Sequence, residues 1–349
     1  MNDRFVIGEH PVGPGEPVYV IAEAGSNHNR DLDLAKQLID AAVEAGADAV
    51  KFQTYSGNRI YSRRTPPISS LQAVSDRPAA ELMEEISLPR DWQPLLAAYA
   101  QEHEIDFFST PFDHDAVDEL DAIGVPAIKI ASFEIGDLPL IRRAAATKRP
   151  LIISTGMATL GEIEEAIEAA AQAGADRLAL LQCTSMYPAP ARLINLGAMA
   201  TMRRAFQVPV GFSDHTTGTA VAIAAAALGA AIIEKHFTLD RSLPGPDHAF
   251  SLEPDELREL VQGVREAQAA LGDGRKSGPT PEEREDLYVV ARRSLVAARS
   301  LPAGTTLERD MLTTKRPGLG IAPRELERVL GRRLKVALDE DDILKWDMV

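Results

Sequence analysis

The sequence predicts an α/β fold in which a (β/α)8 TIM barrel is followed by a small β-rich domain. Apolar strand-like runs and helix-like runs alternate eight times between Val18 and Gly272. Several helix-like runs end in AGA or LGA directly before the next strand, a pattern typical of helix C-termini. After Gly272 the chain becomes polar and rich in Pro and Gly. An open doubly wound sheet is the alternative, but eight evenly spaced units favour the closed barrel.

The first half of the predicted barrel contains four strand–helix units. Each strand is a short apolar run, and each helix is a longer run rich in alanine, leucine and charged residues. We expect strands over 18–25, 49–55, 105–112 and 127–134, and helices over 32–47, 90–104, 114–124 and 137–147. A long polar loop separates the second strand from its helix.

The second half contains four more units. We expect strands over 150–157, 178–185, 208–215 and 231–237, and helices over 160–175, 195–206, 217–230 and 253–272. In the clearest unit, Thr216 or Thr217 can cap an alanine-rich helix that ends at Gly229. The strands on either side of this helix are then parallel neighbours. This places His215 and His236 at the same C-terminal end of two adjacent strands.

Three segments make up the predicted domain organisation. A catalytic barrel covers 1–271, a linker that begins GDGRKSGPTP covers 272–287, and a small domain covers 288–349. A domain of about 60 residues has a marginal core of its own. We therefore expect the small domain to pack against another surface.

Composition excludes several classes of protein. A net charge of −15 and a pI of about 5.0 argue against nucleic acid or an anionic membrane as the main partner. The single cysteine, Cys183, allows no internal disulfide and fits a reducing compartment. We expect no membrane-spanning run and no signal peptide, because the sequence contains no apolar stretch of the required length. The sequence therefore predicts a cytoplasmic protein.

Ionisable and hydroxyl side chains stand at the C-terminal ends of all eight predicted strands, where the active site of such a barrel lies. Lys51 and Lys129 are set in apolar strands, and with neighbouring serines and threonines they form a candidate site for phosphate or carboxylate. His215 and His236 could share one divalent metal, and Glu23 could act as a base. Ordinary core histidines and surface lysines are the alternative. A whole ring of buried polar groups is costly unless it is used, which favours function.

A series of motifs runs through nearly the whole chain. They are AEAGSNHN, DAVKFQTY, FFSTPFD, IKIASFE, ISTGMATLGEI, QCTSMYPAP, GFSDHTTG, IIEKHFTLDRSLPGPDHAFSLEP and RRSLVAARSLPAGTTLERDMLTTKRPGLGI. In this order they resemble the sialic acid synthases, which condense phosphoenolpyruvate with an N-acetylated hexosamine. The last motif resembles the antifreeze-like SAF domain, a β-clip fold, that these enzymes share with type III antifreeze proteins.

The resemblance implies roles for individual residues. His215 and His236 are the implied ligands of a divalent metal, most often Mn²⁺, with Mg²⁺ or Co²⁺ as alternatives, and Glu23 is the implied catalytic carboxylate. The implied phosphoenolpyruvate contacts are Lys51, Thr110, Lys129, Ser132, Ser154 and Ser213. The implied sugar contacts are Gln53, Glu134, Ser185, Tyr187, Asp247 and Arg316. Arg316 is expected to reach the active site of the partner subunit in a domain-swapped homodimer.

The implied reaction is a carbon–carbon bond-forming transfer. C3 of phosphoenolpyruvate attacks the aldehyde of an open-chain sugar, water adds to C2, and phosphate leaves. The acceptor stays open between N-acetylmannosamine and a 2,4-diacetamido-trideoxyhexose. The phenylalanine at position 250 resembles the pattern of the pseudaminic acid synthases, whereas the PGPDH segment before it resembles the pattern of the neuraminate and legionaminate synthases. Arg30 and Ser185 also depart from the neuraminate pattern.

Two further classes of function are considered. A 3-deoxy-ulosonate-phosphate synthase acting on a phosphorylated aldose would need a second pocket rich in Arg or Lys, which the predicted rim lacks. A non-catalytic carbohydrate- or ice-binding protein would need no ring of polar residues around a metal site. The observations therefore favour the sialic acid synthase reaction.

Overall fold

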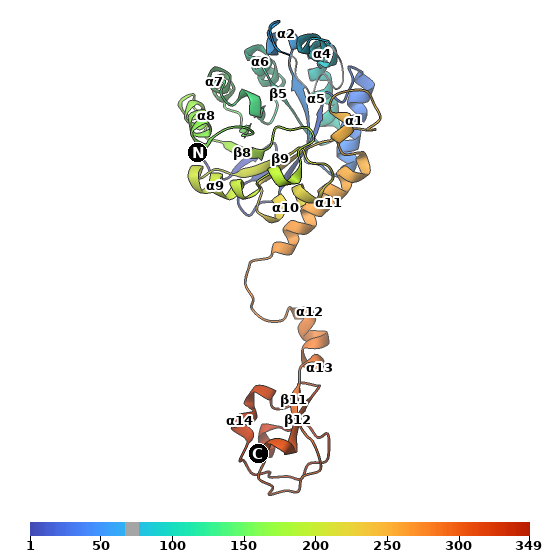
Figure 1. Ribbon diagram of the computed structural model, residues 1–349, viewed down its shortest axis with the longest axis vertical. Helices are drawn as coiled ribbons and strands as arrows, with labels where there is room; N and C mark the ends of the chain where they lie inside the picture. Colours follow the sequence, from blue (N-terminus) through green and yellow to red (C-terminus); the bar gives the residue numbers. More distant parts are fainter. Residues whose placement is uncertain (67–76) are drawn as a thin grey trace. The chain divides into compact units, whose positions relative to one another are not determined.

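The structure is a computed structural model that describes residues 1–66 and 77–349. Part of the predicted long loop, residues 67–76, lies outside the described residues. The chain divides into two compact units, Met1–Gly272 and Asp273–Val349. Figure 1 shows the helices and strands of both units.

Eight parallel strands form the centre of the first unit, as the sequence predicts (Figure 1). They are hydrogen-bonded in the order β5-β4-β3-β10-β9-β8-β7-β6, and β5 also contacts β6, so the barrel is nearly closed. The strands are β3 (Tyr19–Gly25), β4 (Ala49–Thr54), β5 (Asp106–Pro111), β6 (Ile128–Ile130), β7 (Leu151–Ser154), β8 (Leu178–Cys183), β9 (Val210–Asp214) and β10 (Ile232–His236). Closure brings β10 against β3, although the two strands are about two hundred residues apart in the sequence.

Helices surround these strands, one after each (Figure 1). They are α1 (Leu32–Ala45), α5 (Gln93–Glu102), α6 (His114–Ile123), α7 (Leu138–Ala146), α8 (Leu160–Gln172), α9 (Gly197–Phe206), α10 (Ala220–Ala227) and α11 (Pro254–Leu271). The glycine prediction is confirmed at α1, which ends at Gly46 with φ of 77°. Within 1–66 and 77–349, no helix combines the length and the apolar composition that crossing a membrane requires.

The predicted start of α10 was wrong. The helix begins after Thr219, not at Thr216 or Thr217. Gly218 has φ of 73°, a left-handed conformation that a right-handed helix cannot contain. Residues 216–218 are therefore a turn, and this turn extends the loop that follows His215.

Short elements that the sequence analysis did not predict lie outside the barrel repeat. A hairpin of β1 (Phe5–Ile7) and β2 (His10–Val12) precedes the first barrel strand. Within the loop after β4, α2 (Gly57–Ile60) and α4 (Ala79–Ile86) form. These elements are too short to show a clear hydrophobic period in the sequence.

The second unit has a small core of its own. Its two strands, β11 (Ser294–Ala297) and β12 (Leu312–Lys315), pair in antiparallel orientation. The short helices are α12 (Pro281–Glu283), α13 (Val289–Ala291) and α14 (Leu326–Val329). The core consists mainly of leucine, including Leu295, Leu307, Leu338 and Leu344. This unit therefore gains its order from few apolar side chains, as its size leads us to expect.

Candidate active site

The C-terminal ends of neighbouring strands carry the predicted side chains on the inner face of the barrel. In the register of the sheet His236 lies opposite Glu23, and Glu23 lies opposite Lys51. Successive side chains of a strand point to opposite faces. Glu234 therefore faces the barrel interior, as does His236, which lies two residues after it in β10.

Glu23 is held by two contacts at the centre of this group. Lys51 Nζ lies 2.8 Å from Glu23 Oε2, and Gln53 Nε2 donates a hydrogen bond of 2.8 Å to Glu23 Oε1. Lys51 also donates to Thr110 Oγ1 at 2.9 Å. Burial raises the pKa of the Glu23 carboxyl to about 7, although Lys51 opposes the shift. A carboxyl with this pKa can take up or release a proton near neutral pH.

The second lysine is bound in the same way. Lys129 Nζ donates to Ser154 Oγ at 2.6 Å and to the carbonyl oxygen of Ile130 at 3.0 Å. Its side chain is 2% exposed, and burial lowers the pKa of its ammonium group. Like Lys51, it presents a positive charge to the barrel interior among hydroxyl groups.

Glu234 links the two lysines, a role that the sequence analysis missed. Its Oε2 lies 3.7 Å from Lys51 Nζ, and its Oε1 lies 3.9 Å from Lys129 Nζ. Ser213 donates to Glu234 Oε1 at 3.1 Å. Burial raises the pKa of Glu234, but Lys129 and Lys51 outweigh burial and hold that pKa below its usual value. The two-residue spacing to His236 is the signal that could have identified it.

The two predicted histidines lie side by side, with ring centroids 5.4 Å apart. His215 Nδ1 is 2.9 Å from the carbonyl oxygen of Thr184. Because a carbonyl only accepts, Nδ1 carries the proton and Nε2 keeps a free lone pair. His236 Nδ1 is buried without a hydrogen-bond partner, and Asp247 Oδ2 lies 3.9 Å from it. Burial, together with His215, lowers the pKa of His236 well below its usual value, which keeps this ring neutral.

These histidines fit an open metal site. Imidazole nitrogens are typical ligands of divalent transition metals. His236 is neutral, whereas burial lowers the pKa of His215 but Cys183 outweighs burial and raises it, so an ion bound there would displace the proton that His215 Nε2 holds in the charged ring. Among residues 1–66 and 77–349, no group of three or more His, Cys, Asp or Glu side chains is placed so that it could hold a metal ion. Catalytic metal sites keep a position for substrate or water, and two histidine ligands are compatible with this.

Aromatic rings form one wall of the site. Tyr187 packs on His215 with ring centroids 4.1 Å apart, and Phe250 lies 5.2 Å from His236 and 5.5 Å from Tyr187. Asp247 lies shortly before Phe250 in the same loop, and burial raises the pKa of its carboxyl to about 6. Phe250 was considered in the sequence analysis only for the type of sugar, and the structure brings it directly against a histidine.

Three further predicted residues follow β6 and β8, and Gly156, after β7, lies between them. Ser132 Oγ accepts a hydrogen bond of 3.0 Å from the backbone of Gly156. A Cβ atom at Gly156 would collide with both Ser185 Oγ and Ser132 Oγ, so a side chain there would fill this part of the site. Ser185 Oγ and Glu134 Oε2 are buried without a hydrogen-bond partner. Burial raises the pKa of Glu134 to about 7.

Arg316 is the predicted site residue that lies in the second unit. It directly follows β12, is exposed, and donates from Nε to the carbonyl oxygen of Ala291 at 2.9 Å. The structure therefore brings together the predicted residues of the barrel, and Arg316 belongs to the other compact unit.

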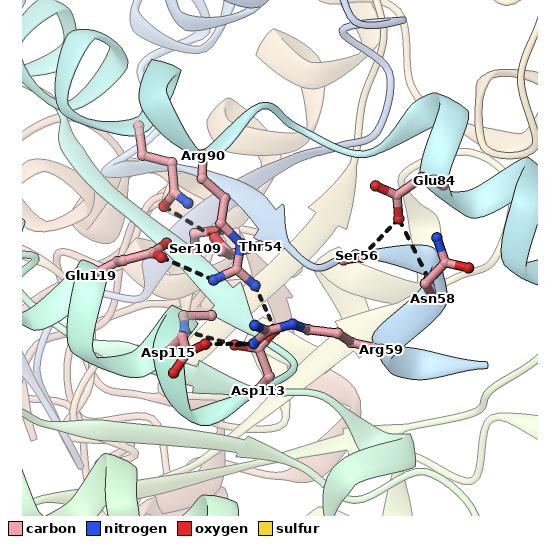
Figure 2. Close-up of polar contacts among 12 residues, drawn as sticks. Thr54, Ser56, Asn58, Arg59, Glu84, Arg90, Ser109, Asp113, Asp115 and Glu119 are labelled. Atoms are coloured by element: carbon pink, nitrogen blue, oxygen red, sulfur yellow. Dashed lines mark hydrogen bonds and ion pairs between the residues drawn. The ribbon is translucent and has the colours of Figure 1, made fainter. Parts of the chain in front are cut away.

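A further polar layer lies beside the ends of β4 and β5 (Figure 2). Thr54 Oγ1 is 2.8 Å from Ser109 Oγ and donates to Gln93 Oε1 at 3.0 Å. Figure 2 also shows Arg90 paired with Asp113 and Glu119, the latter at 3.0 Å. These contacts join the loops after the two strands and stand outside the group around Glu23.

Comparisons with known proteins agree with this arrangement. A model of the NeuB family matches residues 38–276, and a model of the SAF domain matches residues 292–349. The chain is 41% identical over 362 residues to N,N'-diacetyllegionaminic acid synthase of Legionella pneumophila, covering 100% of this chain and 99% of that protein. It is 35% identical over 335 residues to pseudaminic acid synthase of Helicobacter pylori, covering 95% and 98%.

Solved structures show the same relationship. The crystal structure of N-acetylneuraminic acid synthetase from Leptospira borgpetersenii in complex with citrate matches with a TM-score of 0.74 and 36% identity, covering 82% of this chain and 96% of that one. A truncated 3-deoxy-D-arabino-heptulosonate 7-phosphate synthase from Thermotoga maritima matches with a TM-score of 0.61 and 17% identity. The latter likeness shows the fold alone.

Proposed function

The chain belongs to the NeuB family of nonulosonic acid synthases, and we propose that it condenses phosphoenolpyruvate with an open-chain N-acylated hexosamine to give a nonulosonic acid and phosphate. One observation carries the proposal: two buried lysines surrounded by hydroxyl groups lie beside two histidines at one end of the barrel. The first feature suits an anionic donor, and the second suits a polarised carbonyl.

Lys51 and Lys129 bind the donor in this proposal. Both ammonium groups lie within 4 Å of the Glu234 carboxylate, so they converge on one region. Thr110 and Ser154, already in contact with them, add hydroxyl groups that can bind phosphate oxygens. The pocket thereby holds phosphoenolpyruvate with C3 facing the acceptor.

His215 and His236 would hold the divalent ion, most readily Mn²⁺, with Mg²⁺ or Co²⁺ as alternatives. When bound, the ion supplies Lewis-acid polarisation of the aldehyde oxygen. The donor chemistry fits, because His236 Nδ1 is buried without a partner and His215 keeps Nε2 free.

The bond changes follow from these positions. C3 of phosphoenolpyruvate forms a bond to the aldehyde carbon, and the aldehyde oxygen takes up a proton to become a hydroxyl. Water adds to the cationic C2 and gives a proton to Glu23, whose pKa of about 7 suits it to this transfer. The C2–O bond to phosphate then breaks with its electron pair leaving on phosphate, and the C2 hydroxyl passes its proton to the departing phosphate and becomes the ketone. The proton that Glu23 took from water balances the one that the aldehyde oxygen gained.

The acceptor is proposed as a class. Gln53, Glu134, Ser185, Tyr187 and Asp247 are the proposed sugar contacts, and the unpartnered atoms Ser185 Oγ and Glu134 Oε2 are available to its polar groups. A cytoplasmic location belongs to the same proposal and rests on the single buried cysteine.

A phosphate-release assay tests the reaction. The purified chain is incubated with phosphoenolpyruvate and each of N-acetylmannosamine, several 2,4-diacetamido-trideoxyhexoses, and tetrose and pentose phosphates. We expect release with an N-acylated hexose, loss of release after exhaustive chelation, and its return with Mn²⁺. Release with a sugar phosphate alone would replace this proposal by the 3-deoxy-ulosonate-phosphate reaction, and full activity after chelation would exclude the metal.

We also propose a domain-swapped homodimer. Large apolar side chains are exposed after three neighbouring strands: Phe133 after β6, Met157 after β7 and Met186 after β8, at 59%, 70% and 45%. In the second unit Leu319 is 60% exposed, three residues after Arg316. Exposed apolar groups at a barrel mouth suit a covering surface of the same kind. The second unit of a partner subunit, with its Arg316, is the proposed cover.

Mixed dimers test this assembly. Chains carrying Arg316→Ala are mixed with chains carrying His236→Ala, each inactive or weak alone. One of the two sites in a mixed dimer then contains both wild-type residues if the arginine acts across the dimer. We expect activity to return, and its absence in heterodimers shown to form would contradict the swap.

A further inference from the structure

A buried ion pair lies on the outer face of β9 and β10, where the proposed reaction makes no use of it. Lys235 Nζ donates to Asp214 Oδ2 at 2.8 Å, and the two side chains are 1% and 0% exposed. Both residues alternate with side chains of the inner face, Lys235 between Glu234 and His236. They therefore point away from the barrel interior, toward the surrounding helices.

The same two side chains bind the backbone after β9. Asp214 Oδ1 accepts a hydrogen bond of 2.8 Å from the backbone N–H of Thr216, and Lys235 Nζ also donates to the carbonyl oxygen of Thr216. The segment from Asp214 to Thr216 is thus held at both ends, and His215 is its middle residue. On the other strand His236 directly follows Lys235.

The strand ladder ends where this pair begins. Lys235 and Asp214 are the last residues in register between β10 and β9, and β9 itself ends at Asp214. His215 lies one residue beyond the ladder, and it is hydrogen-bonded to Thr184 and Ala189, which follow β8. Between β9 and β10, the ion pair is the side-chain connection on the outer face, opposite the Ser213–Glu234 hydrogen bond of the inner face.

Burying two charges is expensive, and a well-packed apolar pair of similar volume is often as stable or more so. The retention of charge at this place therefore calls for a role other than stability. We propose that Asp214 and Lys235 are positioning residues that set the spacing of His215 and His236, and through it the affinity for the divalent metal. This inference rests on the proposed function.

The test uses the full chain with Asp214→Asn and Lys235→Met together. The double substitution removes both charges, so that neither is left buried alone, and the amide oxygen introduced by Asp214→Asn can still accept from the backbone of Thr216. Mn²⁺ binding is measured from the electron paramagnetic resonance signal of the free ion, without substrates. Phosphoenolpyruvate binding is measured by calorimetry without metal. We expect Mn²⁺ to bind 10- to 100-fold more weakly, about the usual effect of residues behind metal ligands, with phosphoenolpyruvate binding within about twofold.

Two additional variants keep the result decisive. Thr54→Val is the matched control, because Thr54 also lies buried at a strand end outside the active-site group, and its Mn²⁺ affinity should equal that of the wild type. Asp214→Glu alone, which keeps both charges paired but lengthens the side chain by one methylene, serves if the double variant does not fold, with an expected loss of about three- to tenfold.

The outcomes distinguish a failure of this inference from a failure of the proposed function on which it rests. Wild-type Mn²⁺ affinity in the folded variants, or an equal loss of Mn²⁺ and phosphoenolpyruvate binding, overturns the positioning role and leaves the proposed reaction intact. Absence of Mn²⁺, Mg²⁺ or Co²⁺ binding by the wild type overturns the metal site and this inference together.

Discussion

The inner and outer faces of the barrel carry different kinds of polar group at the same strand ends. On the inner face, Glu234 Oε2, His236 Nδ1 and Ser185 Oγ are buried without hydrogen-bond partners. On the outer face, Lys235 is bound to Asp214, and Thr54 is bound to Ser109. The inner groups are thus available to a ligand, whereas most outer groups satisfy one another.

Some outer atoms depart from this division. Gln93 Nε2, Glu119 Oε2 and Thr216 Oγ1 are buried without a hydrogen-bond partner, although other atoms of these residues are bonded. The two faces therefore differ in what their polar groups do more than in how many hydrogen bonds those groups form. Buried polar atoms that face the barrel mouth point to substrate binding, and those behind the strands point to the fixing of geometry.

The two outer clusters also differ from each other. Behind β4 and β5 the buried contacts of Thr54 with Ser109 and Gln93 are between neutral hydroxyl and amide groups, and the ion pairs of Arg90 in the same layer (Figure 2) are partly exposed. Behind β9 and β10 the buried contact is between the full charges of Lys235 and Asp214. Both clusters stand at the end of a ladder, but β4 and β5 pair over six residues, whereas β9 and β10 pair over three. Strong contacts are thus placed where the sheet provides the least restraint.

The largest expected effect comes from the inner face, at Glu23→Gln. The amide keeps the size of the side chain but cannot accept a proton, so kcat should fall about 10²- to 10⁴-fold. The fold should persist, because Lys51 keeps Glu234 as a partner. Steady-state phosphate release and thermal unfolding measure the two effects. Glu165→Gln, on the exposed face of α8, is the control, and a kcat within threefold of wild type for Glu23→Gln would remove Glu23 from the reaction.

A smaller effect is expected at Lys129→Met. Loss of a charge-assisted contact to the donor should cost about 1.5–3 kcal/mol, which is roughly a 10- to 150-fold rise in KM for phosphoenolpyruvate. The KM for the sugar should change little, because Lys129 contacts Ser154 and lies near Glu234 instead of the aromatic wall. Initial rates with each substrate varied in turn make the measurement. Lys276→Met, in the exposed segment after α11, is the control, and an unchanged donor KM for Lys129→Met would contradict the anion site.

Glu134→Gln tests the cost of an unsatisfied inner group through pH. Burial raises the pKa of Glu134 from 4.5 to about 7, so the folded chain keeps a proton that the unfolded chain releases between these values. Wild-type stability from this group therefore falls as pH rises from 4.5 to 7. The variant lacks this loss and should be more stable than wild type by about 1–2 kcal/mol at pH 8, and by much less near pH 5. Urea unfolding of wild type and variant at pH 8 and pH 5 measures this difference in stability. An equal difference at the two pH values would contradict the raised pKa of Glu134.

The smallest effect on catalysis is expected on the outer face, at Thr54→Val. Loss of its contacts with Gln93 and Ser109 should destabilise the fold by about 1–2 kcal/mol. KM values for both substrates should stay within about twofold, because Thr54 points away from the inner group. Urea unfolding and initial rates test this, with Thr201→Val on the exposed face of α9 as control. A large change in KM would break the distinction between the faces.

Much of the fold could be predicted from local pattern. All eight strands and the helix after each were identified, because a buried parallel strand and a long helix leave different periods and lengths in a sequence. The start of α10 was missed, since a threonine can cap wherever the chain allows it, and only the backbone at Gly218 showed where the helix begins. The β1–β2 hairpin was too short to leave a signal.

The sequence by itself determined which side chains reach the rim of the barrel, because alternation along each strand decides the face and the strand order decides the level. Only the tertiary structure decided which of them meet. Closure of the barrel brings Lys51 to Glu23 and Glu234, and the end of the β9 ladder leaves Lys235 and Asp214 to hold the histidine segments. The pKa of Glu23 is likewise a tertiary property. It depends on burial and on the charges of Lys51 and Glu234, which come from strands far apart in the chain. No local sequence pattern shows how close these charges lie to Glu23.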